Sequence, residues 1–351
     1  MAHGLFDLHL QLQKIDENGD PLVKINLLID WELFRKDLEN AREQARSHEP
    51  KSNAGRKPID VILIFKMLVL QSLYNLSDDA TEQQCLDRLG FQRFLGLAIG
   101  EAAPDAKTLW AFKEMLKPND LAKVLFLRFD DFLRNNGFEA KQGQIVDANI
   151  VRVRIRRDTP EVNKQVKAGD GGSVTTWSEP TRLQKDIDAR WTKKNNKSYF
   201  GYKDHESVDV KHKLIRAYRI TSAEVHDSQV YEELLTANDS VEEYADSAYR
   251  SEQRMKTRIL DDKIPHFQEK GTRGHPLTEQ RKLANRERSR VRSRVEHVFG
   301  AKVMRASNMI VRTIGMARAK VKLGLRNLVY NLERYAMLKL RSFVGGGGVA
   351  A

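Results

Sequence analysis

Residues 1–140 have the spacing of polar and apolar side chains that is typical of helices. The segment Trp31–Arg46 has helical spacing, and Ile59–Tyr74 is apolar nearly all round, which predicts a buried helix. Pro58 precedes this run and suits the first turn of a helix. The polar stretch Ser47–Arg56 between the two helices is predicted to be a linker. We therefore expect an all-helical N-terminal domain.

Polar residues mark where further helices of this domain begin and end. Ser77, which acidic residues follow, is a typical N-cap, and its helix is predicted to end at Gly90. Asp105 begins another helix, and Asp120 caps a third that stops at Gly137. Helices joined by short turns form either a helix-turn-helix surface for DNA or a surface for packing and dimerisation, and the pattern leaves both open.

The pattern changes to that of β-structure at Gln144. Alternation and β-branched residues predict the strands IVDANIVRVRI, YFGYKDHESVDV and LIRAYRITSAEV, the last two joined by a turn at Lys211–Lys213. Two later strands, VEEYADSAY ending in Asp246 and IPHFQEK, alternate with helices, of which the first begins at the predicted cap Asp227. We expect an α/β domain over residues 141–342, a mixed sheet with flanking helices.

Three features complete this organisation. Residues 156–197 are polar and without a clear period, which predicts a basic insertion. Two long helices are expected at Thr278–Lys302 and Met316–Leu340. The glycine-rich residues 343–351 are expected to form a disordered tail.

Positive charge is concentrated in the C-terminal part of the chain. The chain has 60 Lys and Arg against 48 Asp and Glu, a formal net charge of +12. Arg281–Arg341 contains 17 basic and 3 acidic residues, Arg152–Lys213 contains 15 and 9, and the first 140 residues contain 18 and 22. A block of one sign indicates either a polyanionic partner, of which nucleic acid is the commonest, or a solvated helix face.

Composition excludes several classes of protein. A chain of 351 residues with 40% hydrophobic content can build a core, which excludes wholesale disorder. Its one cysteine, Cys85, cannot form an internal disulfide, and no Cys and His cluster has zinc-finger spacing. Neither a secretory signal nor a membrane-spanning run is recognisable. We expect a cytoplasmic protein that does not enter a membrane.

Three acids occupy positions where an α/β sheet can place a catalytic site. Asp147 lies inside an apolar strand, Asp246 closes a later strand, and Glu296 lies on the basic helix. A carboxylate inside a strand needs a hydrogen-bonding partner, an opposite charge or a metal ion. Hard oxygen ligands favour Mg²⁺ or Mn²⁺, and two such ions can assist in-line attack on a phosphodiester. Each acid taken alone is also compatible with a salt bridge.

Six sequence blocks together resemble the transposases of bacterial insertion sequences, in the branch that includes insertion sequence five. In order, they are GRKPIDVILIFKMLVLQSLYNLSDDATEQQ, IVDANIV, YFGYKDHESVD, EVHDSQ, YADSAY and RSRVEHVFG. The resemblance implies a ribonuclease-H-like catalytic domain whose Asp, Asp, Glu (DDE) triad, here Asp147, Asp246 and Glu296, binds two divalent ions, Mg²⁺ or Mn²⁺. It also implies cleavage of DNA at terminal inverted repeats and joining of the 3′-hydroxyl ends to target DNA.

The helix around the glutamate both follows and departs from the pattern of this family. Arg292 lies one turn before Glu296 on the same face, where a guanidinium can hold a phosphate. The family commonly has a lysine seven residues after the glutamate, whereas this chain has Val303 there and Lys302 one position earlier. Ser289 stands where the family commonly has a tyrosine.

Basic and aromatic residues outside the triad are candidates for DNA contacts. The predicted contacts are Arg290, Arg292, Arg294, Lys302, Arg250, Tyr249, Arg154 and Arg156. Trp177 and Trp191 are candidates for stacking on bases, whereas Trp110, on an amphipathic helix, is predicted to pack in the core.

The predicted function is that of a DNA transposase that acts on double-stranded DNA as a homodimer or higher oligomer, in the cytoplasm at the nucleoid. Two alternatives stay open. A metal-dependent nuclease with the same site would cut DNA without joining it. A repressor derived from a transposase would bind DNA with an inactive site, and the departure at Val303 is compatible with that alternative.

Overall fold

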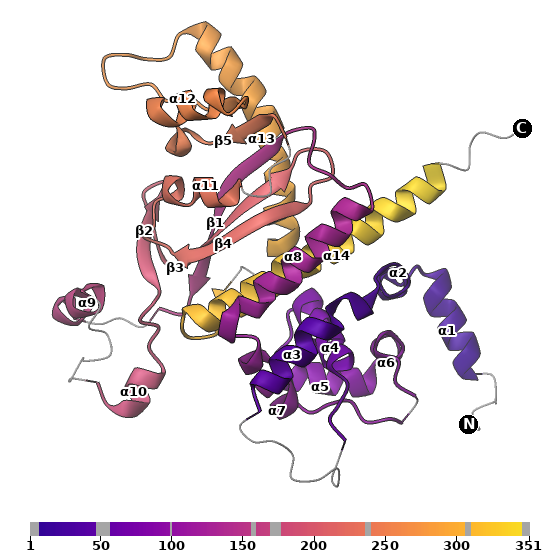
Figure 1. Cartoon of the computed structure of the whole chain (residues 1–351). Helices are drawn as coiled ribbons and strands as arrows, with labels where there is room; N and C mark the ends of the chain where they lie inside the picture. The colour runs from indigo at the N-terminus through magenta and orange to yellow at the C-terminus, as the bar shows by residue number, and fades with distance from the viewer. Residues whose placement is uncertain are drawn as a thin grey trace, which may run out of the picture. The chain divides into compact units, whose positions relative to one another are not determined.

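The computed structural model describes two compact units, shown in Figure 1. The described residues are 7–46, 57–98, 100–155, 159–168, 177–235, 240–305 and 310–345. One unit, the helical unit, comprises Met1–Asn136 and Gly324–Ala351, and the other, the sheet unit, comprises Gly137–Leu323. This division differs from the expected one, because the last helix from Gly324 onward belongs to the helical unit.

The N-terminal part of the helical unit contains helices alone among its described residues, as expected. They are α1 (Asp7–Glu17), α2 (Pro21–Leu28), the 3-10 helix η1 (Trp31–Phe34), α3 (Arg35–Gln44), α4 (Val61–Tyr74), α5 (Asp78–Asp87), α6 (Leu89–Leu95), α7 (Ala106–Met115), η2 (Pro118–Asp120) and α8 (Leu121–Asn135). Aromatic rings from η1, α4 and α8 meet in its core, where Phe34 lies 4.9 Å from Phe65 and 6.3 Å from Phe129 between ring centroids. The predicted linker 47–56 lies outside the described residues.

Capping side chains decide where these helices begin. The side chains of Ser77 and Asp105 accept hydrogen bonds from the first turns of α5 and α7, as predicted. The N-cap of α4 is Asp60, so Pro58 precedes the helix and is not in its first turn. The helix predicted to end at Gly90 ends earlier, and Gly90 lies in the first turn of α6. Burial gives a further correction, because Trp110 on α7 is 52% exposed and does not pack in the core.

Among its described residues, the sheet unit is built on one mixed sheet of seven strands. These are β1 (Gln144–Val153), β2 (Arg190–Lys194), β3 (Lys197–Asp209), β4 (Ile215–Ser222), β5 (Glu242–Ala245), β6 (Ile264–Phe267) and β7 (Ile310–Val311). Strand β1 pairs antiparallel with β3 and parallel with β5, β3 pairs antiparallel with β2 and β4, and β5 pairs parallel with β6. This order confirms the expected ribonuclease-H-like mixed sheet behind an all-helical N-terminal region.

Helices of the sheet unit pack against this sheet. Helix α13 (Glu279–Arg305) packs against β1 and β5, α11 (Tyr231–Leu234) against β3 and β4, and α12 (Glu252–Leu260) against β6. Two 3-10 turns, η4 (Asp227–Gln229) and η5 (Ser247–Tyr249), precede α11 and α12. The last helix, α14 (Met316–Gly345), is divided between the two units.

Two segments for which the sequence predicts no helix or strand contain regular structure where the structure describes them. The insertion 156–197 contains α9 (Pro160–Lys167), α10 (Glu179–Leu183) and β2, although its sequence has no clear period. These elements are too short for periodicity to stand out, and caps and strand pairing define them instead. Helix α14 extends through residues 343–345 of the predicted tail, and residues 346–351 lie outside the described residues.

No single helix among the described residues is long and apolar enough to cross a membrane. Helices α4 and α5 are long and apolar enough only when they are taken together, and they meet at a bend of 103°.

Gly201 marks a close approach of two strand backbones in the sheet. It lies in β3 opposite both Arg152 and Arg190, its φ is +153°, and a Cβ built on it would lie 2.1 Å from the carbonyl oxygen of Val151. No side chain fits there, which explains the glycine in the YFGYKDH block.

We expect Gly201→Ala to lower the free energy of unfolding by at least about 2 kcal/mol, because the methyl group would push β3 off β1. Urea unfolding of the purified protein measures this. Gly300→Ala is the matched control, since Gly300 is helical with open space around it and alanine favours helices. Equal stability of Gly201→Ala and the wild type would contradict the close approach.

Candidate active site

Asp147 and Asp246 meet where β5 ends beside β1. Parallel pairing sets Val146 of β1 opposite Ala245 of β5. The residues that directly follow these two in the chain are the predicted acids, Asp147 and Asp246. Strand β1 continues beyond this point, whereas the chain turns into η5 directly after β5. Sites of α/β sheets commonly lie at such carboxyl ends of parallel strands. The prediction that these two acids come together is therefore supported by the register of the sheet.

One guanidinium lies between the two carboxylates. Arg292 of α13 donates from Nε and Nη2 to Oδ2 of Asp147, both at 3.3 Å, and its Nη1 lies 3.7 Å from Oδ1 of Asp246. The same Nη1 donates to Oε1 of Gln268, directly after β6, at 2.7 Å. The sequence predicted Arg292 beside the acids as a phosphate contact, but did not predict that it pairs with both aspartates.

Asp147 is an acid held in an unfavourable environment. It is 8% exposed, and burial raises the pKa of its carboxyl above the usual range. The charges of Arg292 and Lys194 and a 2.9 Å hydrogen bond from the backbone N–H of Ala148 oppose that rise in pKa, while the nearby Asp246 adds to it. A buried carboxylate with a second carboxylate beside it favours a cation as its neighbour.

Glu296 lies on the same helix as Arg292, one turn further along, and its side chain is exposed. Within the described ranges, no group of three or more His, Cys, Asp or Glu side chains is gathered closely enough to hold a metal ion. The structure thus brings together two of the three predicted acids. The oxygen donors of Asp147 and Asp246, which already share one cationic partner, are nevertheless of the kind that Mg²⁺ and Mn²⁺ prefer.

Two residues predicted to contact DNA are buried, so those predictions are wrong. Lys302 is 3% exposed and pairs with two acids of β3, Asp204 at 3.2 Å and Glu206. Tyr249 is 1% exposed and packs in a core cluster with Val146. Lys302 neutralises buried acids and Tyr249 packs in the core of the unit, so neither side chain can reach a DNA strand.

The other predicted DNA contacts lie at or near the surface. Arg290, Arg294, Arg250 and Arg154 are exposed. Arg294 donates to the carbonyl oxygen of Val210 at 2.9 Å, and these four residues stay predictions as DNA contacts. Arg156 lies outside the described residues.

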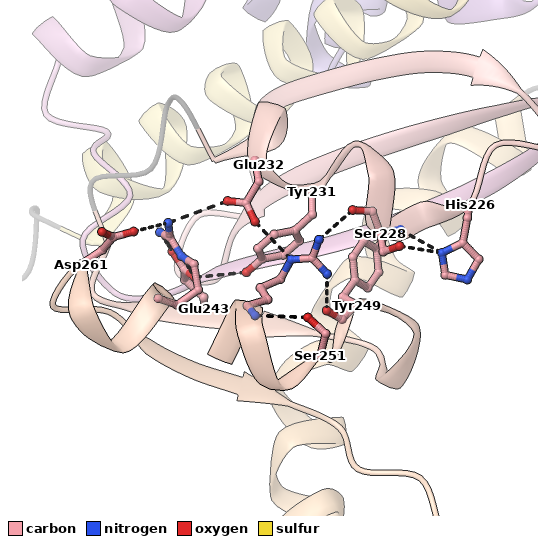
Figure 2. Close-up of polar contacts among 10 residues, drawn as sticks. His226, Ser228, Tyr231, Glu232, Glu243, Tyr249, Ser251 and Asp261 are labelled. Atoms are coloured by element: carbon pink, nitrogen blue, oxygen red, sulfur yellow. Dashed lines mark hydrogen bonds and ion pairs between the residues drawn. The ribbon is translucent and has the colours of Figure 1, made fainter. Parts of the chain in front are cut away.

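Arg254 of α12 connects the turns η4 and η5, whose residues Ser228 and Tyr249 are labelled in Figure 2. Its guanidinium donates to the carbonyl oxygen of Tyr249 in η5 at 2.6 Å and to that of Ser228 in η4 at 3.0 Å. It also pairs with Glu232 at 3.1 Å and lies 5.1 Å from the ring centroid of Tyr231. Because Asp246 is the N-cap of η5, Arg254 fixes the turn that presents this acid. No local pattern indicates this role, since Arg254 lies in an ordinary polar helix.

The η4 turn also differs from the prediction made for Asp227. The N-cap of η4 is His226, which accepts a hydrogen bond from the N–H of Ser228, drawn in Figure 2. Asp227 instead pairs with Lys203 of β3 at 2.8 Å. Asp227 is therefore part of an ion pair on the sheet and does not act as a helix cap.

Family comparisons identify the class of protein. Residues 10–115 match the family model described as Transposase domain (DUF772). Residues 139–332, more than half of the chain, match the model described as Transposase DDE domain. The chain belongs to the Transposase DDE domain family. It is a DDE transposase, and the predicted resemblance to the transposases of insertion sequences is confirmed.

One similar solved structure is the cryo-EM structure of the piggyBac transposase synaptic complex with hairpin DNA. It is 12% identical in sequence to this transposase, with a TM-score of 0.47, and the match covers 95% of this chain and 77% of that chain.

Arg254→Ala should slow the transposase reaction by about 10- to 100-fold, because it would shift Asp246, a predicted catalytic acid, and a small misplacement of a catalytic group is costly. The single-turnover rate measures this, with DNA affinity expected to stay unchanged. Lys256→Ala on the same helix, at an exposed position, is the control. A wild-type rate for Arg254→Ala would show that the η5 turn holds Asp246 in place without it.

His205 should make the transposase sensitive to acid. It is fully buried on β3, its Nε2 shares a 2.9 Å hydrogen bond with Thr221, and burial lowers its pKa to about 4 against the opposing charge of Asp227. In the unfolded chain, His205 takes up a proton near the usual pKa of histidine, whereas in the folded chain it stays neutral until the pH approaches 4. Stability is therefore fully present above the unfolded pKa and is lost as the pH falls toward 4, by about 3 kcal/mol.

Urea unfolding at several pH values between neutrality and this acid range measures the effect. His205→Gln should remove most of the loss. His275→Gln, at an exposed loop position, should leave it unchanged. An equal loss of stability in His205→Gln and the wild type would assign the acid sensitivity to other groups.

Proposed function

We propose that this transposase cuts DNA at the terminal inverted repeats of its element and joins the freed 3′-hydroxyl ends to target DNA. The observation that carries the proposal is the parallel register of β1 and β5, which sets Asp147 and Asp246 side by side around one cationic group. Glu296, on the helix that supplies this group, is the third acid of the proposed triad. These three residues would hold two divalent ions, Mg²⁺ or Mn²⁺.

The donor set supports this assignment. DDE transposase domains use divalent metal ions, which activate the attacking hydroxyl and stabilise the departing 3′ oxygen when bound. A hard cation suits Asp147 in particular, because burial raises the pKa of its carboxyl and a further positive charge favours the carboxylate form.

The chain's own residues orient the reactants in this proposal. Arg292 lies next to both acids and is only partly buried, so its guanidinium is placed to donate to the phosphate next to the cleaved bond. Exposed cations of the sheet unit, Arg290, Arg250 and Arg154 among them, would bind the DNA backbone. Because two element ends must be brought together, we propose that a homodimer or higher oligomer acts on the DNA, in the cytoplasm at the nucleoid.

Asp147→Asn should abolish cleavage of a DNA that carries the inverted repeats flanking the gene, while binding of that DNA persists. Glu296→Gln should have the same effect, whereas Glu287→Gln, an exposed acid on the same helix, should cleave normally. Gel analysis of cleavage in the presence of Mg²⁺ and a gel shift measure the two properties. Retained cleavage in Asp147→Asn would remove Asp147 from the mechanism.

Pre-cleaved ends distinguish the remaining functions. Incubated with a supercoiled plasmid, they should give joined products with the wild-type transposase. Cleavage without joined products would indicate a nuclease, and binding without either reaction would indicate a repressor.

A further inference from the structure

Arg292 is held by a neutral side chain as well as by the two aspartates. Its Nη1 donates a 2.7 Å hydrogen bond to Oε1 of Gln268, which is shorter than its 3.3 Å contacts with Asp147 and its 3.7 Å contact with Asp246. Gln268 directly follows β6, the neighbour of the strand β5 that leads to Asp246. The shortest of these contacts of the guanidinium is therefore made by a group without charge.

The amide of Gln268 has one orientation that satisfies both of its neighbours. A guanidinium only donates hydrogen bonds, so the carbonyl oxygen of the amide must face Arg292. The amide nitrogen then points the other way and donates to Oγ of Ser289 at 2.6 Å. Because Ser289 and Arg292 lie three residues apart on α13, they are neighbours on one face of this helix. Gln268 thus bridges two adjacent positions of the helix that carries Arg292.

The backbone around Gln268 is fixed to both the sheet and the helix. The N–H of Gln268 donates to the carbonyl oxygen of Ala245, the last residue of β5, at 3.1 Å. The next residue, Glu269, makes two backbone hydrogen bonds with the side chain of Asn285 on α13, at 3.0 and 2.8 Å. The amide of Gln268 therefore projects from a backbone that is held on both sides, directly beside the end of β5.

A neutral partner for Arg292 differs from a carboxylate in its effect on cation binding. Asp147 and Asp246 cannot pair fully with Arg292 and with a divalent cation at the same time, since both partners are positive and compete for the same carboxylates. The amide of Gln268 has no net charge and takes no part in this competition. Its hydrogen bond can therefore keep the guanidinium in place while the other N–H groups of Arg292 turn to a phosphate.

We infer that Gln268 is a positioning residue for the reaction, which holds the guanidinium of Arg292 where the phosphate next to the cleaved bond binds. This inference rests on the proposed function, since it takes that phosphate as the partner of Arg292. Gln268 acts through Arg292 alone in this proposal. Its loss should consequently matter only as long as Arg292 is present.

A double-mutant cycle tests this dependence. Gln268→Met, which keeps the length of the side chain but loses the amide, should slow single-turnover cleavage of the repeat DNA by about tenfold. Arg292→Gln, which keeps a donor for Asp147, should slow it by about 100-fold. The double variant should match Arg292→Gln within about a factor of two, whereas a purely structural role of Gln268 would give independent effects that multiply to about 1,000-fold.

A second measurement needs neither metal ions nor catalysis. In the Asp147→Asn background, without divalent ions, fluorescence anisotropy compares the repeat DNA with the same DNA that carries a neutral methylphosphonate at the cleaved bond. The charged phosphate should strengthen binding about fivefold when Gln268 is present, and less than about twofold in Gln268→Met, because the guanidinium is no longer held there. Gln280→Met, at an exposed position of α13, is the matched control and should keep the full difference.

The outcomes separate this inference from the proposed function. Cleavage by Gln268→Met at the wild-type rate, multiplied effects in the double variant, or an undiminished affinity difference in Gln268→Met would each overturn the inference. If Arg292→Gln is slow in such a case, the inference fails alone. Full activity of Arg292→Gln would instead contradict the proposed contact of Arg292 with the phosphate, and the inference would fall with it.

Discussion

Burial of acidic side chains in the central sheet is the constraint on which the sheet unit depends. Asp147, Asp204 and Glu206 are buried on one face of β1 and β3, where an unpaired carboxylate would cost several kcal/mol. Helix α13 supplies the partners, with Arg292 paired to Asp147 and Lys302 to the other two acids. These two contacts lie ten residues apart, about 15 Å along the helix, so they fix its position along the sheet as well as its rotation. Glu296 lies between these two contacts on the helix, so they also set its position relative to the sheet.

A buried acid paired with an arginine also holds β5, the strand that leads to Asp246. Glu243 of β5 is fully buried and pairs with Arg258 of α12 at 2.5 Å, and it accepts a hydrogen bond from the hydroxyl of Tyr231 at 3.1 Å. One turn earlier on the same helix, Arg254 holds the backbones of η4 and η5. Two arginines of one helix therefore anchor the strand that leads to Asp246 and the turn that follows it. Asp246 itself stays partly exposed.

The sequence was informative wherever a local pattern has one structural meaning. The alternation around Asp147, the hairpin of β3 and β4, and the short strand before Asp246 were predicted close to their observed bounds. Lys302 was misjudged because α13 is basic on all sides, so periodicity does not show which cation is buried. A signal for its burial does exist in β3. Asp204 and Glu206 lie two residues apart in β3, so they share one face of the strand, and two acids on one buried face require a cation.

Other parts of the site could not be predicted because they depend on contacts between segments far apart in the chain. Nothing near Arg254 in the sequence indicates that it reaches the carbonyl oxygen of Ser228, which lies 26 residues away. Tyr249 follows an acid in a short turn, a position open to solvent in many proteins, and only the packing of Val146 and Tyr231 against it makes it part of the core. Strand β2 of the insertion likewise takes its conformation from pairing with β3.

The contacts of its basic side chains also change how the positive charge of α13 is interpreted. The sequence offered two interpretations of this basic block, a surface for a polyanion and a solvated helix face. Among its cations, Arg288, Arg292, Arg294 and Lys302 all contact acids or carbonyl oxygens of the sheet unit, whereas Arg290 is exposed. Of these cations, Lys302 is buried, so its charge neutralises acids of the interior and is not available to DNA. The net charge of a segment indicates the sign of its partner, and burial then decides which of its cations can reach that partner.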